Sequence, residues 1–176
     1  MTWQDDVLLL LVADASVPRK GLWLDTWLRS YPTAIDVVCA SDEPASAWQA
    51  RLNEVIDAHL GPVFVVAHGV GVLATLAWVA QASLRTQGRV KGAILAAPVC
   101  LPEHDERQAV LQRARVCFPT ALVCSDNDDY CSVAAASALA QSCGARLMNR
   151  GPLGHMTEGL GSWQWGMKLM QELLLA

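Results

Sequence analysis

Val63-Phe-Val-Val-Ala-His-Gly-Val-Gly71 is the segment from which the rest of the chain is most easily interpreted. Its first four residues are all apolar, which predicts a buried strand. A tight turn containing Gly69 follows directly, and Val72-Leu-Ala-Thr-Leu-Ala-Trp-Val-Ala80 continues with the composition of a helix. The segment therefore predicts a buried strand, a sharp turn and a helix in immediate succession.

Strand and helix patterns alternate on both sides of this segment. Further strands are expected at 7–13, 34–39, 90–97, 121–125 and 145–148, and helices at 22–28, 45–59, 71–84, 133–143 and 163–175. Residues 103–115 are predicted to be a polar connection. The alternation predicts an α/β fold, a three-layer α/β/α sandwich around a mostly parallel sheet. We expect residues 1–176 to form one compact domain without a lid domain, with any substrate site at the carboxyl ends of the strands.

Composition limits the possible functions. Of the 176 residues, 53% are hydrophobic and 17% are charged, which predicts a folded domain with a large core. The net charge is −4 and no run is rich in Lys or Arg, which argues against nucleic-acid binding. The apolar run Val7–Val12 is too short to span a bilayer and follows no basic segment, so we expect a cytoplasmic protein without a membrane partner. The six cysteines show neither a Cys-x-x-Cys pair nor zinc-type spacing, so no metal or other cofactor is expected.

The turn at Gly69 has the architecture of a nucleophile elbow. In α/β-hydrolases, Gly-x-Ser-x-Gly places a serine at the apex of such a turn, and N–H groups at the start of the next helix stabilise an oxyanion. In this chain Ala67 stands at the first glycine position and Gly69 at the apex. Glycine cannot attack a carbonyl carbon, and the next hydroxyl, Thr75, lies a turn or more into the predicted helix. The sequence predicts an elbow without its nucleophile, with the N–H of Val70 as a candidate oxyanion donor.

Two further segments complete a family resemblance. Ser125-Asp-Asn-Asp-Asp-Tyr-Cys-Ser132 follows a predicted strand, and Gly151-Pro-Leu-Gly-His155 comes later in the chain. Together with the elbow, they resemble the Val-x-His-Ser-x-Gly, Ser-x-Asn-Asp-x-Tyr-Cys-Ser and Gly-x-x-Gly-His patterns of small serine hydrolases related to retinoblastoma-binding protein nine and the bacterial YdeN-type proteins. The resemblance runs from about Val7 to the end and is most specific between Leu122 and Gly161. It implies an α/β-hydrolase fold and an ester-like substrate.

The resemblance also implies roles for individual residues. Asp128 matches the family acid and His155 the family histidine, while Asp126 and Asp129 flank the acid and are less favoured. An ordinary loop histidine is the alternative interpretation of His155. His68 matches a histidine that the family carries immediately before the nucleophile, and we favour a structural role at the elbow over a new catalytic base.

The loop after the first predicted strand departs from the family pattern as well. Many relatives have a glycine-containing turn there, which helps to complete the oxyanion hole, whereas this chain reads Ala13-Asp-Ala-Ser16. Asp14 would place a negative charge where a developing anion is meant to bind. Gly69 and Asp14 are therefore taken as two separate departures from standard ester or amide hydrolysis.

Several functions are compatible with these residues. The preferred one is a degenerate hydrolase that keeps the acid–histidine pair and binds a small-molecule ligand or a protein partner. The alternatives are an active hydrolase or lyase that uses the His155–Asp128 pair as a general base, an inactivated variant of a serine esterase, and an interaction module with exposed tryptophans at 22–28 and 163–165. We expect most of these tryptophans to be buried, and the sequence leaves both turnover and oligomeric state open.

Overall fold

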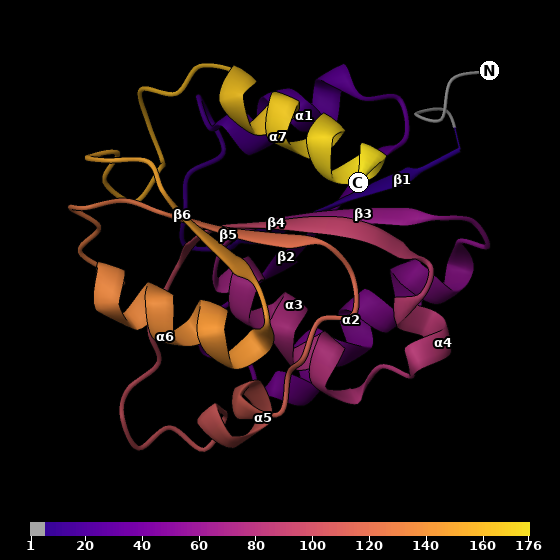
Figure 1. Ribbon diagram of the computed structural model, residues 1–176, viewed down its shortest axis with the longest axis horizontal. Helices are drawn as coiled ribbons and strands as arrows, with labels where there is room; N and C mark the ends of the chain where they lie inside the picture. The colour runs from indigo at the N-terminus through magenta and orange to yellow at the C-terminus, as the bar shows by residue number, and fades with distance from the viewer. Residues whose placement is uncertain (1–5) are drawn as a thin grey trace.

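The computed structural model describes residues 6–176, which form a six-stranded sheet with helices on both faces (Figure 1). The strands are β1 Leu8–Asp14, β2 Ala34–Cys39, β3 Val63–Gly69, β4 Val90–Pro98, β5 Thr120–Cys124 and β6 Arg146–Asn149. Their order across the sheet is β2-β1-β3-β4-β5-β6, and each neighbouring pair is parallel. The carboxyl ends of all these strands therefore lie along one edge of the sheet.

Helices cover both faces of this sheet. On one face, above the sheet in Figure 1, lie α1 Trp23–Ser30 and α7 Gln164–Leu175. The other face is covered by α2 Ala45–Ala58, α3 Val70–Gln81, α4 Leu84–Gln87, α5 Gln108–Gln112 and α6 Val133–Cys143. The predicted three-layer α/β/α sandwich is confirmed, and in the described residues the sheet is wholly parallel.

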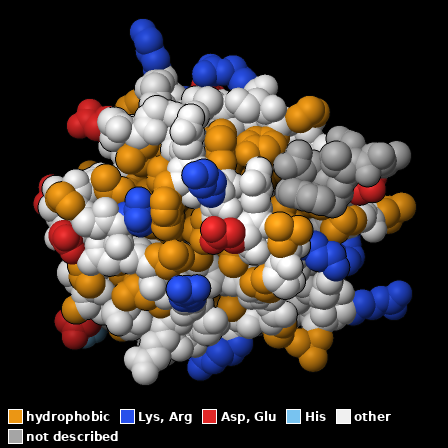
Figure 2. Space-filling model, turned by 45° about the horizontal axis from the view of Figure 1, so that its top comes forward, with side chains coloured by type: hydrophobic (Ala, Val, Ile, Leu, Met, Phe, Trp, Pro, Cys, Tyr) orange, Lys and Arg blue, Asp and Glu red, His pale blue; other side chains and the backbone are white. Residues whose placement is uncertain are grey.

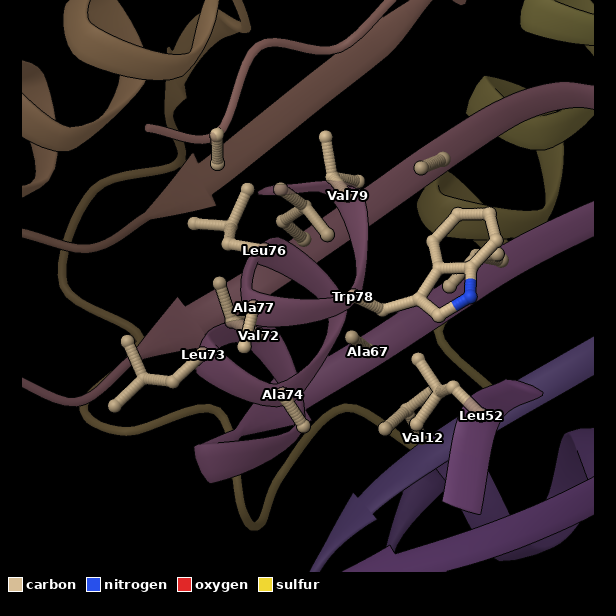
Figure 3. Packing of buried hydrophobic residues seen from close by; sticks show 14 of the residues in the cluster. Val12, Leu52, Ala67, Val72, Leu73, Ala74, Leu76, Ala77, Trp78 and Val79 are labelled. Atoms are coloured by element: carbon tan, nitrogen blue, oxygen red, sulfur yellow. The ribbon is translucent and has the colours of Figure 1, made fainter. Parts of the chain in front are cut away.

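The central strand and the helix that follows it lie in the middle of the core. All seven residues of β3 and the first ten residues of α3 are buried. A helix that is apolar all round its axis is suited to burial on all sides, and Figure 3 shows Leu73 and Leu76 leaving α3 on one side and Trp78 on the other. The indole N–H of Trp78 donates to Asn53 Oδ1 of α2 at 2.8 Å. This packing holds the turn between β3 and α3 independently of any side chain at the turn itself.

The predicted elements agree with the structure to within a few residues, except that the short helices α4 and α5 were not predicted. Residues 103–115, predicted to be a polar connection, contain the short helix α5 at Gln108–Gln112. Leu111 of this helix is buried against the core beneath the sheet. A short polar helix is marginal by itself and depends on such tertiary contacts, which periodicity over five residues could not reveal.

The tryptophans of α1 fasten this helix to the loop that contains His155. Trp23 and Trp27 are at most 1% exposed, and their ring centroids lie 5.3 Å apart. The indole N–H of Trp23 donates to the carbonyl of Met156 at 3.0 Å, and that of Trp27 donates to the carbonyl of Ser162 at 2.7 Å. The expectation that these tryptophans are buried is confirmed, and their burial positions a loop of the candidate site.

Other features of the surface bear on possible partners. On the face shown in Figure 2, Lys and Arg side chains are separated by apolar and uncharged groups, with acidic side chains among them. Trp163 is only 4% exposed and Trp165 is partly exposed, so these residues and those of α1 do not form the exposed tryptophan patch that the interaction-module hypothesis required. No helix within residues 6–176 is long and apolar enough to cross a membrane.

Candidate active site

Gly69 forms the sharp turn between β3 and α3. Its backbone has φ 60° and ψ −125°, a conformation that glycine adopts easily and other residues adopt with strain. Gly71, two residues later, lets α3 approach β1 closely, because a methyl group at residue 71 would lie 2.0 Å from the carbonyl oxygen of Val12. The turn thus has the strand-to-helix geometry of an elbow; the close approach of α3 to β1 requires Gly71, and Gly69 avoids the strain at the apex.

Asp14 lies directly beside Gly69. It is the last residue of β1, it is 3% exposed, and its Oδ2 accepts the N–H of Val70 at 2.9 Å. A Cβ atom on residue 69 would lie 2.5 Å from Asp14 Oδ2 and 3.0 Å from Asp14 Cβ. These distances are well below the optimum of about 3.5–4.0 Å between non-bonded carbon atoms. The side chain of Asp14 therefore occupies the space that a side chain at position 69 would need.

Three donors hold the carboxylate of Asp14 in this position. Oδ1 accepts the N–H of Ser16 at 2.8 Å and the Ser16 hydroxyl at 2.7 Å, while Oδ2 accepts the N–H of Val70. Val70 begins α3, and the N-terminus of a helix favours a negative charge. The N–H group predicted to be an oxyanion donor is thus already bound to a negative charge that the protein supplies.

The contact between Asp14 and Gly69 changes the interpretation made from the sequence. From the sequence, Gly69 and Asp14 are two separate departures from the family pattern, whereas in the structure each fits the other, because the carboxylate needs the space left by glycine. Ser16 was given no role, although Asp-x-Ser is a spacing in which a carboxylate commonly bonds the backbone two residues later. That local signal could have predicted the orientation of Asp14, but not its contact with residue 69.

Asp128 and His155 are brought together from the loops after β5 and β6. Nδ1 of His155 lies 3.0 Å from each carboxylate oxygen of Asp128, and the two side chains are 10% and 2% exposed, respectively. Asp126 instead accepts the side-chain amide of Asn149 at 2.7 Å. Because Nδ1 faces the carboxylate, Nε2 is the ring nitrogen left to exchange a proton with water or a ligand. The geometry is that of an imidazole oriented by a carboxylate.

Hydrogen bonds between the same two loops set the position of His155. The N–H of Gly154 donates to Asn127 Oδ1 at 2.7 Å, and the hydroxyl of Ser125 donates to the carbonyl of Gly154. The ring of Tyr130 packs against His155, with 4.5 Å between ring centroids. Asn127 and Tyr130 belong to the motif quoted from the sequence, but their roles were missed because their partners lie more than twenty residues later in the chain.

His68 connects the two parts of the site. It is fully buried at the end of β3, and its Nε2–H donates to the backbone carbonyl of His155 at 2.9 Å. Nδ1 has no hydrogen-bond partner within residues 6–176. Burial lowers the pKa of His68 to about 4, and the hydrogen bond to the His155 carbonyl opposes this only in part, so the ring is neutral near pH 7. These contacts support a structural role for His68, directed at backbone rather than at a ligand.

The chain matches the model of one known protein family over most of its length. The family model described as serine hydrolase matches residues 10–172, which is nearly the whole chain. The chain belongs to the serine hydrolase family. The family resemblance drawn from the sequence motifs is thereby confirmed, while no curated protein sequence matches this serine hydrolase family member.

Solved structures of similar fold support the same architecture. A YdeN-like hydrolase from Pectobacterium atrosepticum superposes with a TM-score of 0.83 at 23% identity, covering 97% of this chain and 92% of that chain. The ydeN gene product from B. subtilis gives 0.71 at 14% identity, covering 96% and 98%. Est1E from Butyrivibrio proteoclasticus gives 0.70 at 11% identity, covering 97% and 90%. At these sequence identities the similarity establishes the α/β-hydrolase fold but does not indicate a substrate.

The chemistry that this family member can offer is set by its own side chains. His155 with Asp128 is arranged to take up or release a proton, and the carboxylate of Asp14 opposes the binding of a second negative charge at the N–H of Val70. Within residues 6–176, no group of three His, Cys, Asp or Glu side chains is arranged to hold a metal ion.

Proposed function

We propose that this serine hydrolase family member forms no acyl-enzyme at residue 69 and acts by binding a small-molecule ligand or a protein partner. The observation that carries the proposal is the position of Asp14, whose carboxylate lies in the space of a residue-69 side chain and accepts the N–H of Val70 at 2.9 Å. A tetrahedral oxyanion needs donors that are free to bind it. Acyl transfer of the serine type therefore lacks both its nucleophile and one of its anion-binding groups.

General-base catalysis is a second candidate, favoured by the contact of His155 with both oxygens of Asp128 at 3.0 Å. An imidazole oriented in this way can accept a proton from water or from an acidic C–H group of a substrate. The protein would then be a hydrolase or lyase that acts without a covalent intermediate. Turnover by the natural chain that depends on His155 distinguishes the two candidates.

The two candidates are separated by measuring hydrolysis of p-nitrophenyl acetate with a set of purified variants. The set comprises the natural chain, Gly69→Ser, Asp14→Gly, the double variant Gly69→Ser/Asp14→Gly, and each of these with His155→Ala. Glycine is chosen at position 14 because Asp14 Cβ itself would lie 3.0 Å from a Cβ at residue 69. Cys100 and Cys117 are exposed and can react with the ester, so only the part of the rate that depends on His155 is counted.

We expect the natural chain and Gly69→Ser to show no rate that depends on His155. A serine at position 69 alone still faces the Asp14 carboxylate, whereas the double variant gains both a nucleophile and a free Val70 N–H, which together typically contribute a factor of at least about 100. A rate in the double variant alone would also fit descent from an active serine esterase. His155-dependent turnover by the natural chain would contradict the binding function and favour general-base catalysis.

We also propose that the protein works in the cytoplasm. All six of its cysteines are unpaired, and four of them are buried. Proteins in reducing compartments keep their cysteines in this form. Finding the native protein outside the cytoplasm by cell fractionation would contradict this location.

A further inference from the structure

A cavity of 320 Å³ lies beneath the carboxyl edge of the sheet, away from the Asp14 and His155 side chains. It is bordered by α3, α5, α6 and the segment after β4 and opens to solvent, and its walls are mainly aliphatic, including Leu73, Leu101, Leu111, Ala135 and Leu139. The volume is equivalent to about ten water molecules at their share of liquid volume. Cavities of about 300–1,000 Å³ with apolar walls and a few polar groups are typical of small-molecule sites.

The polar groups of this cavity are all uncharged. Gln108, Gln112 and Ser142 lie along its lining, and no Asp, Glu, Lys, Arg or His side chain of residues 6–176 does. Gln108 Nε2 donates a long hydrogen bond, 3.4 Å, to the carbonyl of Leu101, and Gln112 is exposed. An ion would lose part of its hydration here without gaining an opposite charge, which is costly, whereas a neutral polar group can bond to the glutamine amides.

Cys131 belongs to the same apolar wall and is not a reactive group. Burial, together with its contact with the Cys100 side chain, raises the pKa of the Cys131 thiol well above its ordinary value. The sulfur is therefore a neutral, polarizable part of the lining rather than a thiolate nucleophile. Cys131 therefore contributes only non-covalent contacts to the cavity.

The cavity is connected to the loop that carries Asp128. Cys131 lines the cavity three residues after Asp128, and the N–H of Cys100, another lining residue, donates to the carbonyl of Tyr130 at 3.0 Å. The ring of Tyr130 packs on His155 with 4.5 Å between centroids. A molecule in the cavity would thus contact the segment that orients the acid–histidine pair.

We propose that this cavity is a binding site for a neutral, mainly aliphatic small molecule whose single polar group hydrogen-bonds Gln108 or Gln112. The site is distinct from the position of Gly69, and it goes beyond the proposed function because it does not depend on whether the His155 site turns over a substrate. Its size and uncharged lining select an alkyl chain with a hydroxyl, amide or ester group, and reject the corresponding carboxylate.

The test is an NMR titration of the full chain with 1-octanol and, separately, with sodium octanoate. We expect 1-octanol to shift the signals of cavity residues such as Ala135 and Leu139, and to bind at least tenfold more tightly than octanoate. Ala138→Trp is the blocking variant, because Ala138 lines the cavity and is exposed on α6. Ser137→Trp is the matched control, since Ser137 is also exposed on α6 but does not line the cavity.

Ala138→Trp is expected to weaken 1-octanol binding at least tenfold, while Ser137→Trp binds like the natural chain. The proposal is overturned if the natural chain does not bind 1-octanol, if octanoate binds equally well, or if Ala138→Trp leaves the affinity unchanged. Shifts confined to residues outside the cavity would overturn it too. None of these outcomes affects the ester assay at His155, so failure of this inference is distinguishable from failure of the proposed function.

Discussion

The ends of β1 and β3 and the ends of β5 and β6 meet at the same edge of the sheet, but their side chains are arranged for different purposes. In the first region, the elbow half, Gly69 has no side chain and Asp14 fills the adjoining space under three hydrogen bonds. In the second, the histidine half, Nδ1 of His155 lies 3.0 Å from both oxygens of Asp128. In the elbow half the carboxylate fills the space and its hydrogen bonds are made, whereas in the histidine half Nε2 of His155 has no hydrogen-bond partner among residues 6–176.

The comparison teaches that an elbow can persist for packing reasons alone. The turn connects the fully buried β3 to the largely buried α3, and Gly71 lets that helix pass close to Val12. None of these contacts involves a side chain at position 69. The position of His155, in contrast, depends on contacts of the loops after β5 and β6, including the hydrogen bond from the Gly154 N–H to Asn127. The two halves are therefore expected to respond to substitution on different scales.

Gly71→Ala should produce the largest effect, because it breaks the packing of the elbow half. The added methyl group would lie 2.0 Å from the backbone oxygen of Val12, and neither strand nor helix can move without disturbing the core. We expect the free energy of unfolding to fall by more than about 3 kcal/mol, measured by urea denaturation. Gly88→Ala is the control, since Gly88 has φ −62° and the nearest atom to an added methyl is 3.3 Å away. Similar midpoints for the two variants would show that the close approach is not important.

The pH dependence of stability should be the next largest effect, and it tests the residue that joins the halves. The pKa of His68 is about 4 in the folded protein, against an ordinary value of 6.5, because of burial. Between pH 4 and 6.5 the His68 imidazole binds a proton in the unfolded state but not in the folded state. The contribution of His68 to the free energy of unfolding is therefore complete above pH 6.5 and is lost as the pH falls toward 4. The loss should reach about 3 kcal/mol.

The measurement is urea denaturation from pH 7 to pH 4 for the natural chain and for His68→Gln. Glutamine can still donate to the carbonyl of His155, but it does not titrate. We expect the stability of His68→Gln to fall less steeply with decreasing pH. Parallel curves for the two proteins would show that His68 contributes nothing to the acid sensitivity.

Asn127→Ala should have the smallest effect, confined to the histidine half. It removes the acceptor of the Gly154 N–H, a partly solvated bond of 2.7 Å, and should cost about 1 kcal/mol. Hydrogen exchange should become faster at the Gly154 amide, while the Val70 amide in the elbow half stays protected. Asn127→Asp keeps an acceptor oxygen and serves as the control. Faster exchange at both amides in Asn127→Ala would show that the halves are one cooperative unit.

Much of the fold could be predicted from the sequence because its signals are local. Buried parallel strands are continuous apolar runs, as in Val63–Val66. The helix patterns between these runs indicate that strands and helices alternate, as they do in a parallel sheet. The order of elbow, acid and histidine along the chain likewise pointed to the pairing of Asp128 with His155. The helix α5 was missed because its only strong signal, Leu111, acts through a contact with distant elements.

The sequence by itself determined the alternating architecture, the absence of a serine at position 69 and the candidates Asp128 and His155, since each follows from residue type and order. Only the tertiary structure decided what stands in the place of the missing side chain. Asp14 and Val70 are fifty-six residues apart and meet because β1 and β3 are neighbours in the parallel sheet. A hydrogen bond between the ends of two neighbouring strands depends on strand order and register, which no local pattern specifies.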